Sequence, residues 1–302
     1  MAVHLILILV QILMASLAIL GKLVLREMSP GLLVLVRVGG AAIVLGVVHR
    51  ILALPRVRSS DLPQFALLGL LGISANQTLF LLGLRHTTAI NATILVTTIP
   101  VFTVLESVLT RREPLSRLKL GGILVAGAGA IYLVGPDRIS LAPDVALGNA
   151  LIVLGMLSHS MYLVLSKRML ERYRPITVSY YVMLFGALGV LPFGLGALAT
   201  MDPTAVSGRV WLLTGYIVLC PTILAYFLNI WALKRVSSNL VAVYIYLQPL
   251  FTVVTAPMIL EGERLTTRGL IAGLSIFAGV ILVIRAERAQ NREVPVESLP
   301  GE

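Results

Sequence analysis

Four polar side chains lie inside long apolar stretches of the sequence, and their chemistry is hydrogen bonding rather than bond breaking. Tyr244 and Gln248 are four residues apart, so a helix would place a phenol and an amide on one face. Gln77 and Asn229 add two amides in other apolar stretches. Donors, acceptors and an aromatic ring suit a small zwitterion with an apolar side chain, so we interpret all four as lining a substrate cavity. Polar contacts that hold helices together are the alternative.

Arg37, Asn76, Tyr162 and Tyr226 are further candidates for the wall of this cavity. Arg37 is the one Arg or Lys well inside an apolar stretch, where a charge is costly and usually faces a protein interior. It could bind a substrate carboxylate or set the electric field of the cavity. Alternatively, it makes a structural ion pair, hydrogen-bonds helix ends or extends toward the membrane surface.

Two titratable side chains could move a proton. His159 lies three residues before Tyr162, and histidine changes its charge near neutral pH. Glu106 is the one acid clearly inside an apolar stretch. We therefore predict His159 and Glu106 as candidates for proton coupling. The alternatives are a hydrogen-bonded packing role for His159 and a salt bridge from Glu106 to Arg111 near a helix end.

The sequence lacks the common motifs for catalysis and metal binding. It contains no GxxxxGK[ST], HExxH or CxxC pattern, which argues against ATP hydrolysis and the usual zinc sites. The four histidines are scattered along the chain, and Cys220 is the single cysteine. We therefore expect no metal, no cofactor and no enzymatic activity.

The composition is that of a membrane protein. Hydrophobic residues make up 58% of the 302 residues and charged residues 13%, whereas soluble domains carry about 25% charged residues. Mean hydropathy is +0.95, and several apolar runs are long enough to span a bilayer. These values exclude a soluble enzyme. The net charge of +10 reflects topology rather than nucleic-acid binding, because Lys and Arg in loops orient membrane proteins.

The apolar stretches predict an all-α integral membrane protein with ten transmembrane helices and short loops. Each stretch is about 20 residues long, the length that crosses a bilayer. The predicted spans are residues 3–25, 31–52, 62–84, 88–109, 117–135, 146–169, 176–200, 210–233, 237–260 and 267–285. Residues 288–302 are polar with two prolines and are predicted to form a disordered cytoplasmic tail.

Basic residues are distributed unequally between the loops. Sixteen Lys and Arg residues follow the even-numbered spans, and seven follow the odd-numbered spans. The positive-inside rule places the richer set in the cytoplasm. We therefore predict a multi-pass protein of the inner or plasma membrane with both termini cytoplasmic.

The sequence also contains an internal duplication. Residues 84–100 reappear as residues 233–249 at an offset of 149, and further upstream Lys22 corresponds to Lys167 at an offset of 145. Drifting offsets of this kind are expected from two copies of one unit with small loop insertions.

The duplication divides the chain into two repeats of five spans, residues 1–140 and residues 141–287. Five is an odd number, so the second repeat is predicted to be inverted in the membrane, an arrangement typical of secondary transporters. Pro100 and Pro249 occupy equivalent places in the two repeats. Proline removes a backbone hydrogen bond, so both are candidate hinges, with a static kink as the alternative. Gly269-x3-Gly273 fits either a dimer face or packing within one chain, so we expect a monomer or a homodimer.

Residues common to the two copies carry a resemblance to a known family. The pattern is Leu84-x4-Ala89-x10-Pro100-x12-Glu113, with Gln248-Pro249 and Glu263-Arg264-Leu265 in the second copy and glycine-rich fifth and tenth spans. It resembles the EamA family of the drug/metabolite transporter superfamily over residues 5–285. The segments Val10-Gln11, Gly21-Lys22-Leu23, Met28-Ser29-Pro30 with Arg37, and Asn76-Gln77 look like the plant-type branch of amino-acid and auxin exporters. The resemblance implies ten helices, two inverted repeats and export of small metabolites, commonly amino acids, often driven by ions or protons.

We therefore predict a secondary active transporter that exports a small amphipathic metabolite, most simply an amino acid, by alternating access. Another cargo, such as a nucleoside, a vitamin or a drug-like compound, is the nearest alternative. The shortage of acids inside the spans argues against a transporter specialised for organic cations. A channel and a membrane enzyme are more distant alternatives, and four scattered histidines do not form the polar cluster that an enzyme would need.

Overall fold

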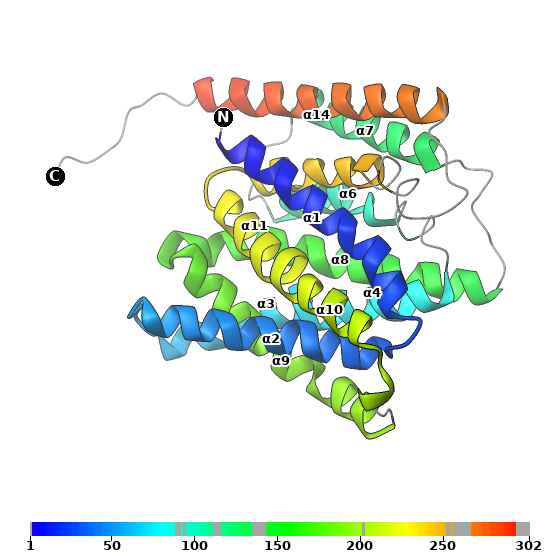
Figure 1. The fold of residues 1–302 in the computed structure, drawn as a ribbon. Coiled ribbons are helices and arrows are strands. Elements are labelled where there is room, and N and C mark those ends of the chain that lie inside the picture. The colour runs from blue at the N-terminus through cyan, green and yellow to red at the C-terminus, as the bar shows by residue number, and fades with distance from the viewer. Residues whose placement is uncertain are drawn as a thin grey trace.

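The computed structural model describes residues 2–87, 92, 95–110, 116–134, 143–200, 203–251, 255 and 267–293, and within these residues the chain is helical with no strand (Figure 1). The elements are α1 Ala2–Val24, α2 Pro30–Ile51, η1 Ser59–Asp61, α3 Leu62–Gly69, η2 Leu70–Ala75, α4 Asn76–His86, α6 Ile99–Leu109, α7 Arg117–Val134, α8 Pro143–Arg172, α9 Pro175–Thr200, η4 Pro203–Ala205, α10 Gly208–Ile217, η5 Val218–Leu224, α11 Ala225–Leu233, α12 Ser238–Val243, η6 Tyr244–Tyr246 and α14 Thr267–Glu293.

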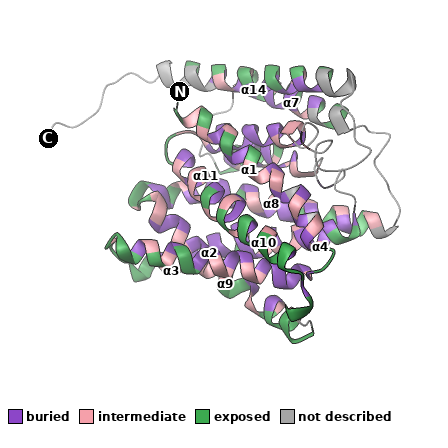
Figure 2. Cartoon of the chain, in the orientation of Figure 1, coloured by how far each residue is buried: buried purple, intermediate pink, exposed green. Residues whose placement is uncertain are grey.

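Six helical segments of the described chain are long and apolar enough to cross a membrane. They are Ala2–Gly21, Pro30–Ile51, Ser59–His86, Val145–Arg172, Pro175–Thr200 and Gly208–Leu233. Large apolar side chains are exposed on these and other helices, for example Ile43, Leu124, Leu212 and Leu274. Figure 2 shows exposed residues along many of the helices. Such a surface is stable against lipid rather than water. The all-helical membrane architecture predicted from the sequence is therefore confirmed, with six clear spans.

Serine caps define where several helices begin. The side chains of Ser29, Ser207 and Ser237 accept hydrogen bonds from backbone N–H groups three residues ahead, at 3.3, 3.4 and 3.1 Å. Each bond satisfies one of the free N–H groups at a helix start. Pro30 follows the first of these caps and occupies a position where proline is tolerated. These caps fix the ends of α2, α10 and α12.

Two spans contain a π-helical segment at matching places. The segment η2 joins α3 to α4, and η5 joins α10 to α11. In η2, Ser74 Oγ donates to the carbonyl of Gly69, five residues back. In η5, Thr222 Oγ1 donates to the carbonyl of Ile217, also five residues back, at 2.7 Å. The hydroxyl groups thus satisfy carbonyls in the wider turns, and such turns often occur at functional sites.

The two predicted kink prolines each follow an irregular turn. Pro100 lies in the first turn of α6, directly after a turn at Thr97 and Thr98. Pro249 follows the 3₁₀ segment η6, Tyr244–Tyr246. Proline cannot donate a hydrogen bond to the carbonyl four residues earlier, and in both places the α-helix is interrupted around that carbonyl.

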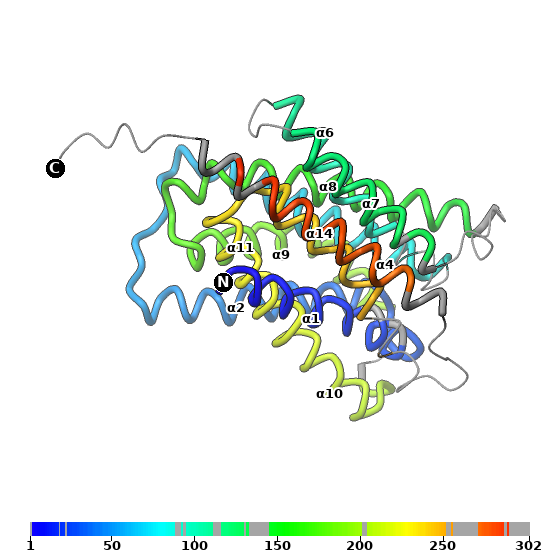
Figure 3. Tube along the Cα trace, turned by 90° about the horizontal axis from the view of Figure 1, so that it is seen from above, coloured from blue at the N-terminus to red at the C-terminus, as the bar shows by residue number. Residues whose placement is uncertain are grey.

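Helices α7 and α14 form a closely packed pair at one side of the molecule (Figure 3). A Cβ atom on Gly279 would lie 2.5 Å from the carbonyl oxygen of Gly122, so only glycine allows this approach. Glycines of the predicted fifth and tenth spans therefore pack within one chain. Helix α14 also corrects the predicted start of the tail, because residues 288–293 are helical; the segment from Arg285 to Glu293 consists mainly of good helix formers.

The remaining helices surround the centre of the molecule. Helices α2 and α9 pack together on the side opposite α7 and α14, and α1, α4, α8 and α11 lie between these two pairs (Figure 1). Helix α1 contacts α11, and α8 contacts both α4 and α6. Segments distant in sequence therefore meet around one central space.

Candidate functional site

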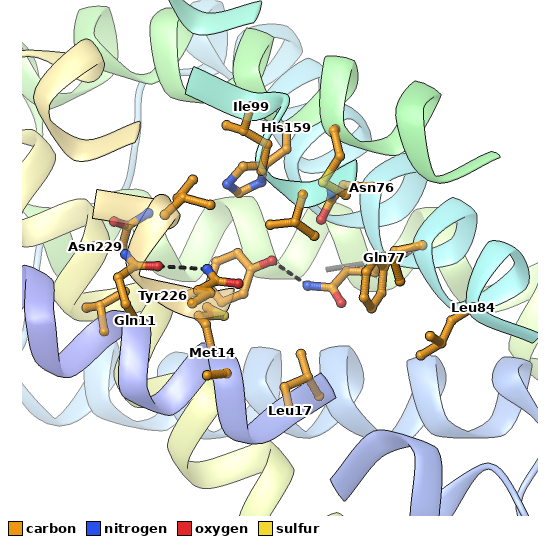
Figure 4. A pocket seen from close by; sticks show the side chains of 18 residues that line it. Gln11, Met14, Leu17, Asn76, Gln77, Leu84, Ile99, His159, Tyr226 and Asn229 are labelled. Atoms are coloured by element: carbon orange, nitrogen blue, oxygen red, sulfur yellow. Dashed lines mark hydrogen bonds between the residues drawn. The ribbon is translucent and has the colours of Figure 1, made fainter. Parts of the chain in front are cut away.

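A cavity of about 100 Å³ lies between α1, α4, α6, α8 and α11 (Figure 4). Most of its wall is apolar, and its polar groups are amides, a phenol and an imidazole. The lining residues are Val10, Gln11, Met14, Ala15, Leu17, Asn76, Gln77, Phe80, Leu84, Ala92, Val96, Ile99, Met156, His159, Tyr226, Asn229, Ile245 and Gln248. No acidic side chain, Lys or Arg is among these residues.

The two halves of the sequence contribute to this wall in matching pairs. Twelve of the lining residues are related by the offsets of the internal duplication. The pairs are Gln77/Tyr226, Phe80/Asn229, Val96/Ile245 and Ile99/Gln248 at an offset of 149, and Gln11/Met156 and Met14/His159 at an offset of 145. Equivalent residues of both predicted repeats therefore face one space.

One of these pairs forms a hydrogen bond across the cavity. Gln77 Nε2, at the start of α4, donates to the hydroxyl oxygen of Tyr226, at the start of α11. Each residue is the second after its π-helical segment, so the two irregular segments position both partners. A second bond between the halves runs from Gln248 Nε2 to Gln11 Oε1 at 2.7 Å.

Two cavity residues keep buried polar atoms that have no hydrogen-bond partner in the described structure. These atoms are Asn229 Oδ1 and His159 Nδ1. His159 is hydrogen-bonded to the backbone of Gly72, which fixes its ring beside the cavity. An unsatisfied buried acceptor costs about 1–3 kcal/mol, so these atoms are the natural partners for a donor group on a bound molecule.

Asn76 and Tyr162 have mainly packing contacts. Asn76 lines the cavity, but its Nδ2 donates to the carbonyl of Gly155 at 3.0 Å. Tyr162 is almost completely buried outside the lining set, with its ring against Gly72. Asn76 thus joins α4 to α8, and Tyr162 supports the π-helical segment η2 from behind.

Tyr244 lies outside the cavity wall, although Gln248 lines it. The 3₁₀ segment η6 advances by about 120° per residue instead of about 100°, so the two residues do not share one face. Tyr244 OH instead lies 2.6 Å from His4 Nδ1, and the two rings stack. The predicted pairing of Tyr244 with Gln248 fails at this local change of helix type.

Arg37 is completely buried but is not among the lining residues. Its Nε donates to Thr222 Oγ1 at 3.1 Å, whereas both terminal guanidinium nitrogens lack a hydrogen-bond partner in the described structure. It therefore faces the protein interior, as expected for a charge inside a span.

Glu106 lies at the contact between α6 and α8, away from the cavity wall. Its Oε1 is 2.9 Å from Ser160 Oγ, and its Oε2 has no partner among the described residues. Arg111, its expected partner, is outside the described residues. The two hinge candidates are closer to the cavity, because Pro100 follows the lining residue Ile99 and Pro249 follows Gln248.

Sequence reasoning did not predict three of the lining side chains that shape the site. Gln11, Met14 and Phe80 lie on the wall together with their equivalents in the other repeat. Gln11 could have been found as a polar residue in an apolar span. The other two could have been found by applying the duplication offsets to His159 and Asn229.

Comparison with known proteins identifies the family. The model of the EamA-like transporter family matches residues 1–135 and again residues 146–285. The chain is 30% identical to an uncharacterized transporter of Archaeoglobus fulgidus, over 92% of this chain and 96% of the relative. It is also 30% identical to a probable terminal-alkyne amino-acid exporter of Streptantibioticus cattleyicolor, over 86% and 85% of the two chains.

More distant similarities point the same way. The chain is 28% identical to Protein WALLS ARE THIN 1 of Arabidopsis thaliana, over 80% of this chain and 71% of the relative. A solved crystal structure shares the fold with a TM-score of 0.78 at 19% identity, over 95% of this chain and 98% of that one. The chain belongs to the EamA-like transporter family, and it is a multi-pass membrane transporter rather than an enzyme.

Proposed function

We propose that this protein is a secondary active transporter that exports a small amphipathic metabolite, an amino acid by first preference, by alternating access. The observation that carries the proposal is the central cavity, whose wall consists largely of equivalent residues from the two halves of the chain. A site shared by two repeats is what a carrier needs if one repeat moves against the other around its cargo.

The proposed architecture has ten transmembrane helices in two inverted repeats, residues 1–140 and 141–287. The two separate matches of the family model, at residues 1–135 and 146–285, support this division. The matching π-helical segments and cavity pairs support it as well. With an even number of spans, both termini lie on one side, and the distribution of basic loops favours the cytoplasm.

The size of the cavity supports alternation rather than a permanent pore. Its volume of about 100 Å³ is below the roughly 300–1,000 Å³ of typical ligand pockets. The helices must therefore move apart to admit most metabolites. Pro100 and Pro249, each next to a lining residue and an irregular turn, are the proposed hinges.

The cavity chemistry favours a cargo that is neutral overall. Its polar groups are uncharged amides, a phenol and an imidazole in apolar surroundings, so no side chain of the wall itself carries a charge that would pair with a net charge on the cargo. A zwitterionic amino acid fits, and a relative named as a probable amino-acid exporter supports that choice. A nucleoside, a vitamin or a drug-like compound is the alternative cargo.

Protons are the proposed coupling ion, with His159 and Glu106 as candidate carriers. His159 lines the cavity and keeps Nδ1 free of a partner in the described structure. A proton bound to this nitrogen and the amine of a cargo would compete for the same position. The protein would then exchange protons for cargo. Glu106 could take part only through α8, because it does not line the cavity.

The test is uptake of a labelled amino-acid panel into proteoliposomes, with and without a pH gradient. We expect saturable uptake of one class of amino acids that rises with the gradient. His159→Gln should abolish the gradient effect, whereas the exposed His86→Gln serves as the matched control. Absence of uptake by protein shown to be folded would exclude amino acids as cargo. Ohmic conductance in a planar bilayer would show that the protein is a channel rather than a carrier.

A further inference from the structure

Arg37 is a buried positive charge without a counter-charge among the described residues. It is fully buried in α2, and no carboxylate lies within 4.0 Å of it among the described residues. Its NH1 and NH2 atoms have no hydrogen-bond partner there. A buried charge is normally paired, so this arrangement is costly unless an anion completes it.

Arg37 lies next to the cavity residue Tyr226. It donates to Thr222, which precedes Tyr226 by four residues on the continuous helix from η5 into α11. Residues at that spacing share a helix face, and Arg37 interacts electrostatically with Tyr226. The guanidinium group therefore lies near Tyr226, outside the set of residues that line the cavity.

Hydrogen-bond donors gather around Tyr226 and acceptors are scarce. Gln77 Nε2 donates to the Tyr226 hydroxyl oxygen, and the hydroxyl proton has no acceptor among the described residues. Turning over the Gln77 amide would satisfy this proton, but both Arg37 nitrogens would remain unpaired. Several donors beside one positive charge form the usual surroundings of an anionic oxygen.

We propose that the carboxylate of the cargo binds between Gln77 and Tyr226, with Arg37 behind Tyr226 as its counter-charge. The carboxylate accepts hydrogen bonds from Gln77 Nε2 and Tyr226 OH, and these bonds replace the one that now joins the two residues. The proposal rests on the transport function proposed above and extends it, because it restricts the cargo to molecules that carry a carboxylate.

The opposite end of the same wall offers acceptors for an amine. Asn229 lies three residues beyond Tyr226 on α11, and its Oδ1 has no partner in the described structure. Figure 4 shows Asn229 and Gln11 on one side of Tyr226 and Gln77 on the other. An ammonium group on the cargo would find an acceptor in Asn229 Oδ1, so the cavity offers partners for both charges of a zwitterion.

This mode of binding links recognition to movement. Gln77 and Tyr226 are equivalent residues of the two repeats and now bond directly to each other. A carboxylate that takes over both donors removes this direct connection between α4 and α11. Binding therefore loosens the contact between the repeats at the point where they must separate.

The first test compares an acid with its amide of the same shape. Purified protein is heated with 3-methylbutanoate or 3-methylbutanamide at equal ionic strength, and the unfolding midpoint is measured. We expect the acid to raise the midpoint more than the amide, because it alone supplies the anion. Arg37→Gln should abolish the difference, whereas Arg50→Gln, an exposed arginine on the same helix, should preserve it. Equal shifts by acid and amide in the unmodified protein would overturn the site.

Tyr226→Phe keeps the test decisive if Arg37→Gln does not fold. This change removes one donor to the carboxylate and preserves the ring, so the difference between acid and amide should fall by about half or more. An unchanged difference would refute binding at this residue.

Transport separates this proposal from the broader one. Leucine should compete for uptake at least about tenfold better than leucinamide, as expected for a charge-assisted pair, and Arg37→Gln should reduce this preference to near unity. Amino-acid uptake with the preference intact in Arg37→Gln would refute the carboxylate site and leave the carrier standing. An Arg37-dependent acid effect without amino-acid uptake would keep the site and exclude amino acids as cargo.

Discussion

Asn229 and Asn239 show two uses of a buried amide in one protein. Asn239 is paired with Ser107, whose hydroxyl lies 3.1 Å from its Nδ2, so it holds α12 against α6. Asn229 lines the cavity, and its Oδ1 has no partner among the described residues. The first amide stabilises the protein, and the second represents a free-energy cost that a ligand can offset.

This difference predicts opposite outcomes for the same substitution. Asn229→Leu should leave the unfolding midpoint unchanged or higher, because it removes an unsatisfied acceptor, and should raise KM for the cargo about tenfold or more. Asn239→Leu should lower stability by about 0.5–1.5 kcal/mol, because it removes the hydrogen bond to Ser107, whose hydroxyl keeps its bond to the Val104 carbonyl. Thermal unfolding and uptake kinetics of both variants provide the check. A destabilised Asn229→Leu with normal KM would show that Asn229 is structural.

Helix type explains which site residues could be predicted from the sequence. Gln77, Asn229 and Gln248 line the central cavity, as expected if a polar residue inside an apolar span faces the protein interior. Tyr244 was misplaced relative to Gln248, because the sequence carries no recognisable signal for the 3₁₀ segment between them. The π-helical segments were not predicted from the sequence either, because the apolar periodicity of a span hardly changes when one turn widens. Apolar length predicted an all-helical membrane protein correctly, and six of the described helices are clear spans.

At the scale of elements, replacing a proline beside the cavity should slow transport, whereas replacing a proline elsewhere should not. Pro249→Ala restores a backbone donor near η6 and should stiffen this segment, so kcat should fall several-fold with little change in KM. Pro192 lies inside α9, outside the cavity wall, and Pro192→Ala is the matched control that should leave kcat unchanged. Uptake kinetics distinguish the two. If kcat is normal in Pro249→Ala, the kink is static.

A loop contact between α1 and α10 should respond to acid. The backbone N–H of Ser207, the cap of α10, donates to Glu27 Oε2 at 2.9 Å and holds the pKa of that carboxyl below its ordinary value of 4.5. A lowered pKa means that the contact is fully formed above pH 4.5 and is lost as the pH falls through the shifted value. Neutral and mildly basic conditions should therefore leave it intact.

Fluorescence of Trp211, in the first turn of α10, can follow this contact in a Trp231→Phe background. The signal should stay constant from pH 8 to about 5 and change below about 4.5. Glu27→Gln should remove the transition at low pH. A transition that persists in Glu27→Gln would assign it to another group.

At the scale of the whole molecule, the cavity wall is not fully symmetric between the two halves of the chain. Leu17, Leu84 and Ala92 line it, whereas the residues equivalent to them by the duplication offsets do not. Those equivalents are Tyr162, Leu233 and Val241, and all three are buried. Leu84 also borders a second hollow formed by the α1–α2 loop. The cavity therefore extends toward the end of the molecule where α1 and α4 terminate.

The proposed inverted repeats predict from this asymmetry which residues line the cavity in the other state of the proposed carrier. If the two repeats exchange conformations, each residue takes the surroundings that its equivalent has here. Leu233 should then line the cavity from the opposite end, and Leu84 should leave the cavity wall. Both states place the Gln77–Tyr226 pair between the repeats, which is where a shared cargo site must remain.

Cysteine accessibility tests this exchange, because the single native cysteine is easily removed as Cys220→Ser. In that background and without cargo, Leu84→Cys should react faster with a membrane-impermeant thiol reagent than Leu233→Cys, because Leu84 borders the cavity and the second hollow whereas Leu233 borders neither. Cargo supplied with a pH gradient should shift the two rates in opposite directions, because one end closes as the other opens. Changes of the same sign at both positions would show that the molecule widens as a whole, as a channel does, and would contradict alternating access.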